Sequence, residues 1–319
     1  MAVIDSMVQH RDIAGLKQLK KHVQDLYRSG EHEKALIASL GAFENFPSER
    51  QFFSLIIVTA QYELDDLNGM IVSFSQFAHY LKDSEPALQQ FAIFFLNHGK
   101  TELYQQAFEL YLKTCPDDNG LTVVLCRLDS PLLTAARAIS LNLLAQQGDR
   151  TCHGTLTAMS LCYLYNESAT CFAVLETILS TSKRAIFAYE YVWLCAREGF
   201  HLDWTLVQDQ GKGLRGAERT MWNMLVLARE GKRLRQNAPP LKILSWLLAD
   251  ICLKNSLTSG QWAERQLQVP KSNVRQLTDL AFLSLRINAL LSPGMITDFD
   301  KAYPSNLVGI ILRKWSRFL

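Results

Sequence analysis

The sequence predicts an all-α protein built as an α-solenoid of antiparallel helical hairpins. Apolar residues recur at spacings of three and four along most of the chain, and no segment alternates like a strand between hairpin turns. Glycine and proline interrupt this pattern so that helices of about 10 to 18 residues are joined by short connections. A unit of about 34 residues also recurs in the first third of the chain, which is typical of helical repeats.

The clearest unit covers residues 26 to 47. Gly30 predicts a turn at the end of a first helix, and Pro47 predicts the end of a second one. Ala35 and Ala42 lie between them, where the two helices would cross. Small side chains suit this position because bulky ones would push the helix axes beyond their usual separation of about 8–10 Å.

Two further units follow the first. In the second, Gly69 lies 34 residues after Ala35, and in the third, Ala107 lies 38 residues after Gly69. The third unit predicts a turn from Gly99 to Tyr104, which is longer than is usual in repeats of this kind. Residues 15 to 117 thus form about three predicted hairpins.

These units resemble the tetratricopeptide repeat, whose first helix ends at a glycine turn and whose second helix carries small residues at the crossing. The resemblance covers about a third of the chain. It implies a superhelix that binds a peptide or helix on its concave face. The lining residues expected on this basis are Arg50, Gln61, Asn68, Ser73 and Gln76. The family's paired Lys and Asn positions that grip a carboxylate are not found in this sequence.

The domain organisation predicted is residues 1–119 as tetratricopeptide-like repeats and residues 120–319 as divergent repeats or a packed helical bundle. In the second part, Ser130 and Pro131 predict a helix start, and the helix over 132–147 stops at Gly148. The string Ala-Arg-Glu-Gly occurs at 196–199 and again 32 residues later, indicating two related helices. The segment 305–319 is expected to cap the array, with docking on a partner or an anionic membrane as the alternative.

Charged residues are distributed unevenly along the chain. Residues 1–120 carry 10 Lys and Arg against 16 Asp and Glu, whereas residues 121–319 carry 23 against 15. The second half is therefore the part expected to face an anionic partner, and the first half is not. Solvated helix ends explain the same cations without a ligand. The candidate anion-binding residues are Lys212, Arg215, Arg219, Arg229, Lys232, Arg233 and Arg235.

Residues 211–216 read G-x-G-x-x-G, the string of a dinucleotide-binding loop. Such a site needs a buried strand before the string and a helix after it. The preceding segment, 203–210, is polar and has a helical setting. The sequence therefore favours a loop between helices over a phosphate site.

No catalytic residues, cofactor site or metal site are predicted. The seven cysteines include no Cys-x-x-Cys pair, and the adjacent Cys152 and His153, at a predicted helix start, point about 100° apart on a helix. No signal-like apolar region opens the chain, and no apolar run approaches the roughly 18 residues that a membrane span needs. We therefore expect a cytoplasmic protein with reduced thiols that is not an enzyme.

The function predicted is a non-catalytic scaffold or adaptor that binds a protein partner. One alternative is an accessory or regulatory subunit of an enzyme held in trans, such as a glycosyltransferase or transcription machinery, as the resemblance implies. Another is binding of nucleic acid or an anionic membrane by the basic second half. The oligomeric state is left open.

Overall fold

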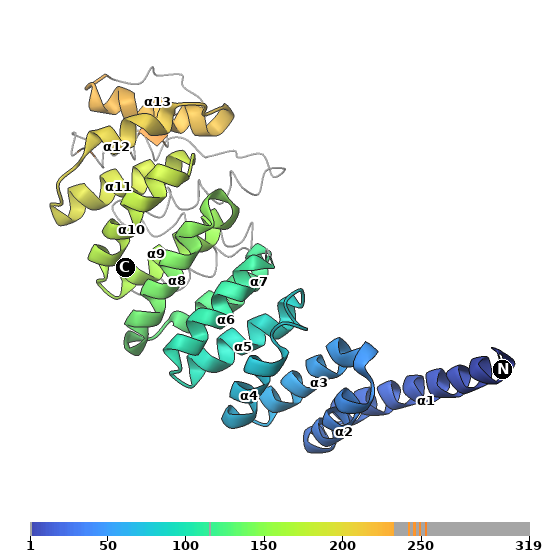
Figure 1. The fold of residues 1–319 in the computed structure, drawn as a ribbon. Coiled ribbons are helices and arrows are strands. Elements are labelled where there is room, and N and C mark those ends of the chain that lie inside the picture. The colour runs from blue at the N-terminus through green and yellow to red at the C-terminus, as the bar shows by residue number, and fades with distance from the viewer. Residues whose placement is uncertain are drawn as a thin grey trace. The chain divides into compact units, whose positions relative to one another are not determined.

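A computed structural model describes residues 2–114 and 116–232, together with residues 242, 245, 246, 249 and 253; the side chains of residues 2–14, 118 and 119 lie outside this description. Within the described residues, the regular structure consists of 13 α-helices and five short 3₁₀ helices, without a strand. The chain divides into two compact units, Met1–Pro116 and Asp117–Leu319. Figure 1 labels the helices of each unit. The predicted all-α class is confirmed for these residues.

The first unit consists of three helical hairpins. In each hairpin the first helix packs against the second, and α2 and α5 also pack against α3. A 3₁₀ turn, η1 (Pro47–Glu49), leads into α3. The helices are α1 (Ala2–Arg28), α2 (His32–Asn45), α3 (Arg50–Glu63), α4 (Leu67–Phe77), α5 (Glu85–Asn97) and α6 (Thr101–Lys113).

The three hairpin turns share one backbone conformation. Gly30, Asp65 and Gly99 have φ values of 80°, 55° and 65°. At each turn the next amide donates to the carbonyl five residues earlier, at 2.9, 3.0 and 2.8 Å. This is the glycine-type helix ending, which satisfies carbonyls that the helix leaves unpaired. The predicted turn at Gly30 is confirmed, but the longer turn after Gly99 is wrong because α6 already begins at Thr101.

The turns set a common register for the hairpins, with intervals of 35 and 34 residues between their left-handed positions. In this register Val23, Val58 and Ala92 are equivalent in the first helices, and all three are fully buried. One set of equivalent positions in the second helices is also fully buried: Ala35, Met70 and Tyr104. The core of the first unit is thus assembled from repeated positions.

The register also corrects the predicted alignment of small residues. The equivalent of Ala35 is Met70 rather than Gly69, and Ala107 is equivalent to Ser73. The 38-residue interval came from comparing positions that are not equivalent. Small residues therefore do not mark the same helix crossing in all three hairpins.

The cap of α4 explains why position 69 is occupied by glycine. The Asp66 carboxylate accepts a hydrogen bond from the Gly69 amide at 2.9 Å at the start of α4. A Cβ atom on Gly69 would collide with that carboxylate and lie 2.6 Å from Nε2 of Gln61. The glycine lets both side chains approach the first turn of α4.

The second unit contains seven described α-helices. In it α8 packs on α9, α10 packs on α8 and α11, and α11 packs on α13. Its helices are α7 (Asp118–Leu125), α8 (Thr134–Gln146), α9 (Cys152–Leu164), α10 (Ser168–Thr181), α11 (Ala185–Glu198), α12 (Trp204–Gln208) and α13 (Gly216–Arg229), with 3₁₀ turns η2 (Cys126–Leu128), η3 (Pro131–Leu133), η4 (Gly148–Thr151) and η5 (Asp209–Gly211).

The helix predicted over 132–147 is present. Ser130 accepts a hydrogen bond from the Leu132 amide, the first turn is 3₁₀, and α8 continues to Gln146 before Gly148 at φ 62°. The two Ala-Arg-Glu-Gly strings each end at a left-handed glycine that follows a helix, α11 or α13. The segment 305–319, predicted to cap the array, lies outside the described residues.

Candidate binding groove in the first unit

One side of α3 is left uncovered by the neighbouring helices. Gln51 is exposed, and Phe52 and Leu55 are half-buried, whereas Phe53 and Ile57 are fully buried. These classes separate on a helix with 3.6 residues per turn, because residues three and four apart share a face. The free face of α3 therefore presents two large apolar side chains to solvent.

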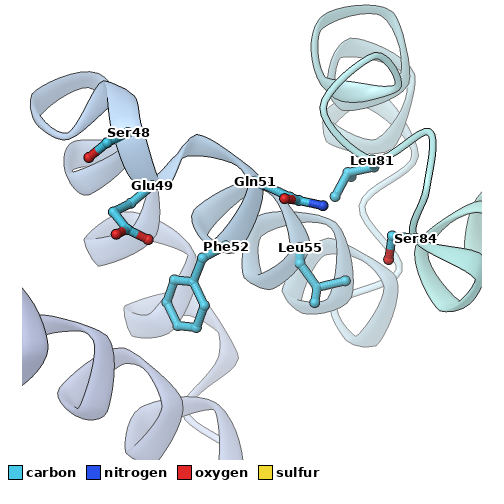
Figure 2. Close-up of a pocket in the computed structure, with 7 residues that line it drawn as sticks. All are labelled: Ser48, Glu49, Gln51, Phe52, Leu55, Leu81 and Ser84. Carbon is cyan, nitrogen blue, oxygen red and sulfur yellow. The ribbon is translucent and has the colours of Figure 1, made fainter.

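A groove of about 300 Å³ lies along this face (Figure 2). One wall comes from η1 and the first turns of α3, and the other from the connection between α4 and α5. Apolar and polar side chains contribute to it in similar measure, as in sites that hold one apolar group and orient it by hydrogen bonds. Its lining residues are Ser48, Glu49, Gln51, Phe52, Leu55, Leu81 and Ser84.

Helix α1 places a cation beside the groove. The Lys20 ammonium pairs with the Glu49 carboxylate and lies 4.9 Å from the centre of the Phe52 ring. The Lys20 and Glu49 side chains are 29% and 28% exposed, so the pair remains accessible from solvent. Such a partly exposed pair contributes little stability, on the order of 0–1 kcal/mol, and exchanges partners at small cost.

Arg50, one of the predicted binding residues, is half-buried and is not part of the groove lining. Its guanidinium donates to the Tyr80 hydroxyl at 3.3 Å and lies 5.1 Å from the centre of the Phe43 ring. Tyr80 immediately precedes Leu81, so this contact joins the two segments that form the groove walls. Arg50 therefore connects the two walls of the groove.

The other predicted lining residues divide into buried and exposed pairs. Gln61 and Ser73 are only 6% and 1% exposed, and the Ser73 hydroxyl donates to Gln61 Oε1 at 2.7 Å. These two are corrected to packing residues between α3 and α4. Asn68 and Gln76 are exposed on α4, outside the groove lining.

Five of the predicted basic residues are described, and they lie at opposite ends of α13. Lys212, Arg215 and Arg219 lie at its start, and Arg229 and Lys232 lie at its end. At about 1.5 Å per residue, the interval of ten residues from Arg219 to Arg229 separates the two groups by roughly 15 Å along the axis of α13. This exceeds the screening length of about 8 Å at physiological salt, so they do not act as a single patch.

Most of these cations have local partners. Lys212 pairs with Asp209 at 2.7 Å, and Lys232 pairs with Glu230 at 2.6 Å. Arg219 donates to the Gly211 carbonyl at 2.6 Å, and the Arg229 guanidinium lies 4.1 Å from the centre of the Trp204 ring. Arg233 and Arg235 lie outside the described residues.

The distribution of charge within the second half is also uneven. Residues 121–232 carry 11 Lys and Arg against 10 Asp and Glu, whereas residues 233–319 carry 12 against 5. The basic excess that favoured an anionic partner thus comes from the part of the chain beyond residue 232. The described part of the second unit offers no comparable excess.

The G-x-G-x-x-G string at 211–216 connects helices. It follows α12 and η5 and leads into α13, so the described chain places a helix where a dinucleotide site needs a strand. A Cβ atom on Gly211 would collide with the Trp222 indole. The first glycine is therefore explained by packing against α13.

The second unit contains a buried polar cluster that sequence reasoning missed. Arg137 on α8 is fully buried; its Nε donates to Glu167 at 2.8 Å and its guanidinium donates to the Leu128 carbonyl at 2.9 Å. The guanidinium also stacks 4.1 Å from the centre of the Tyr165 ring. The sequence feature that could have revealed this cluster is a single arginine in the largely apolar helix predicted over 132–147, because a buried charge requires a partner.

Tyr165 extends this cluster to the turn after η2. Its hydroxyl donates to Asp129 at 2.8 Å. Burial, together with that hydrogen bond, raises the pKa of Tyr165 to about 12. Every polar contact described for the cluster joins segments of one unit, so we assign it a structural role.

Within residues 2–114 and 116–232 no three His, Cys, Asp or Glu side chains gather as metal ligands. Cys152 is buried at the start of α9, as its position predicted, and burial raises the pKa of Cys195 to about 11. Among the described helices, none is long and apolar enough to span a membrane.

Comparisons with known proteins give no match: no family model, curated protein or solved structure is similar to this chain.

Proposed function

We propose that this chain is a non-catalytic protein-binding scaffold, of the tetratricopeptide kind, whose hairpins stack as a solenoid. The proposal is supported by the three turns of one conformation at intervals of 35 and 34 residues. It is also supported by the repeated buried positions, because stacked hairpins bury equivalent faces against one another.

The exposure of residues along α1 also supports the proposed repeat array. Ile57 on α3 and Phe91 on α5 are fully buried, whereas the equivalent residue of α1, His22, is exposed. The same holds for Phe53 and Ala87, which are buried, and Gln18, which is exposed. A polar outer face is what the outermost helix of a repeat array needs.

The groove beside α3 is the proposed partner site, and its half-exposed apolar side chains are the observation that carries this proposal. Phe52 and Leu55 lie on a first helix, and first helices line the concave surface in the family that the sequence resembles. Apolar anchors surrounded by polar side chains are typical of sites that hold a peptide or an amphipathic helix.

The proposal includes a cytoplasmic location and, as an alternative role, that of an accessory subunit of an enzyme. The five described cysteines are free thiols, which fits a reducing compartment such as the cytoplasm. An accessory subunit of an enzyme would use the same groove and would co-purify with that enzyme in a fixed ratio. Binding of nucleic acid or membrane remains the alternative, and it would depend on the basic excess of residues 233–319.

The test is affinity purification of the full-length chain with two variants. Leu55→Arg places a cation in the groove, and Val72→Arg changes an apolar side chain on α4 that is 52% exposed and outside the groove. We expect the same partner with the unaltered chain and Val72→Arg, and its loss with Leu55→Arg. Circular dichroism checks that both variants are folded. Recovery of the same proteins by Leu55→Arg would overturn the proposal.

A further inference from the structure

We infer that the groove selects peptide segments in which an apolar anchor is followed or preceded by an acidic residue. This inference rests on the proposed function and adds the chemistry of the partner. It comes from the charges that the repeat register places along the face of the first helices.

Equivalent positions of α1, α3 and α5 define that face. Lys17 on α1 is equivalent to Phe52 on α3, and Lys20 is equivalent to Leu55. The groove residues that interact with an anchor therefore have lysines as their counterparts one hairpin earlier. Lys20 is in place beside the groove, since its ammonium lies over the Phe52 ring.

The charge along this face changes from α1 to α5. Lys17 is exposed and Lys20 is paired with Glu49, so the α1 side carries two cations against one carboxylate. The free face of α3 contributes Gln51, Phe52 and Leu55, which are neutral. At the α5 end, Glu85 is the equivalent of Gln51 and brings a negative charge. An acidic group of a partner is thus attracted toward α1 and repelled at α5.

The spacing between helices sets the spacing within the partner. Packed helices lie about 8–10 Å apart, so a carboxylate near Lys17 lies roughly that far from an anchor over Phe52 and Leu55. An extended peptide rises about 3.3 Å per residue, which places the acidic residue about three residues from the anchor.

The net negative charge of the first 120 residues does not oppose this selection. Charges separated by more than about 8 Å are largely screened at physiological salt. A carboxylate at the α1 side therefore responds mainly to Lys17 and Lys20. This revises the expectation that the first half would not attract an acidic group.

The experiment selects a display library of random 12-residue peptides on the full-length chain and removes the peptides that also bind the Leu55→Arg variant. The retained, groove-dependent peptides are sequenced, and one is measured by fluorescence anisotropy. We expect an apolar residue with Asp or Glu about three positions away. We also expect Lys17→Glu to raise the Kd of that peptide about tenfold, a change of about 1.4 kcal/mol.

Lys34→Glu is the matched control, because Lys34 is an exposed lysine on α2 with a side chain 71% exposed. It changes net charge equally and should alter the Kd less than twofold. Groove-dependent peptides that lack acidic residues, or equal effects of the two substitutions, would overturn the acidic preference but leave the proposed function standing. Failure to recover any groove-dependent peptide would count against both.

Discussion

At the scale of single residues, Arg137 shows how a buried charge is accommodated. Its guanidinium donates to the Glu167 carboxylate and to two backbone carbonyls, those of Leu128 and Ser130. Few N–H groups of the guanidinium are therefore left without an acceptor. Removing one member of such a buried pair leaves an uncompensated charge, which costs more than the pair itself contributes.

We therefore expect Arg137→Met to lower the free energy of unfolding by about 3 kcal/mol, because Glu167 loses its counter-charge. Urea denaturation followed by circular dichroism measures the change. Arg127→Met is the control, since Arg127 is exposed, and should change stability by less than about 0.5 kcal/mol. Equal small changes in both variants would show that the cluster contributes nothing.

The same pair predicts a dependence of stability on pH. Burial alone would raise the pKa of Glu167, but hydrogen bonds from Arg137 and Thr134 and the charge of Arg137 hold it below the ordinary value. A pKa lowered by folding stabilises the protein above the pKa of the unfolded chain, and this contribution is lost as pH falls through the folded pKa.

Stability should accordingly fall more steeply as pH drops below about 4.5, the ordinary pKa of a glutamate, in the unaltered chain than in Glu167→Gln, which cannot titrate at this position. Urea midpoints at several pH values measure both slopes. Parallel slopes for the two chains would contradict the assignment of the lowered pKa to Glu167.

At the scale of secondary-structure elements, the hairpin turns depend on left-handed residues. Gly30 has φ 80°, whereas Gly41 lies within α2 in ordinary helical conformation. A Cβ atom would meet nothing within 4 Å at either position. The two glycines therefore differ in backbone conformation and not in available space.

This contrast predicts opposite effects of the same substitution. Gly30→Ala should destabilise the chain by about 1–2 kcal/mol, because alanine is strained in the left-handed region. Gly41→Ala should stabilise it by about 0.5–1 kcal/mol, since alanine favours the helix. Thermal or urea denaturation of both variants measures the changes, and a shift of the same sign in both would refute the argument.

The residue types at the turns also explain which helix ends could be predicted from the sequence. Gly30, Gly99, Gly199 and Gly231 indicated helix ends because glycine favours positive φ. Asp65 occupies the same conformation in the second hairpin, and Asn166 does so after α9. Neither residue type marks a turn as strongly as glycine, so the common register emerged only in three dimensions.

At the scale of the whole molecule, the sequence predicts which residues share a helix face, but it does not predict which other side chains that face contacts. Gln61 and Ser73 were expected to line a binding face, yet they hydrogen-bond to each other between α3 and α4. Polar side chains favour exposure, but two that satisfy each other are readily buried. Phe52 and Leu55 show the reverse case, since apolar side chains favour burial but these two line the groove.

The sequence by itself determined the all-helical class, the hairpin turn at Gly30 and the helix that ends at Gly148, because these depend on local spacing and backbone preference. The tertiary structure decided the equivalence of Ala35 with Met70, the pairing of Arg137 with Glu167 and the groove beside α3. Each of these depends on which residues of distant segments meet. A periodic sequence specifies the apolar and polar faces of its helices, but only packing decides which of these faces remain exposed.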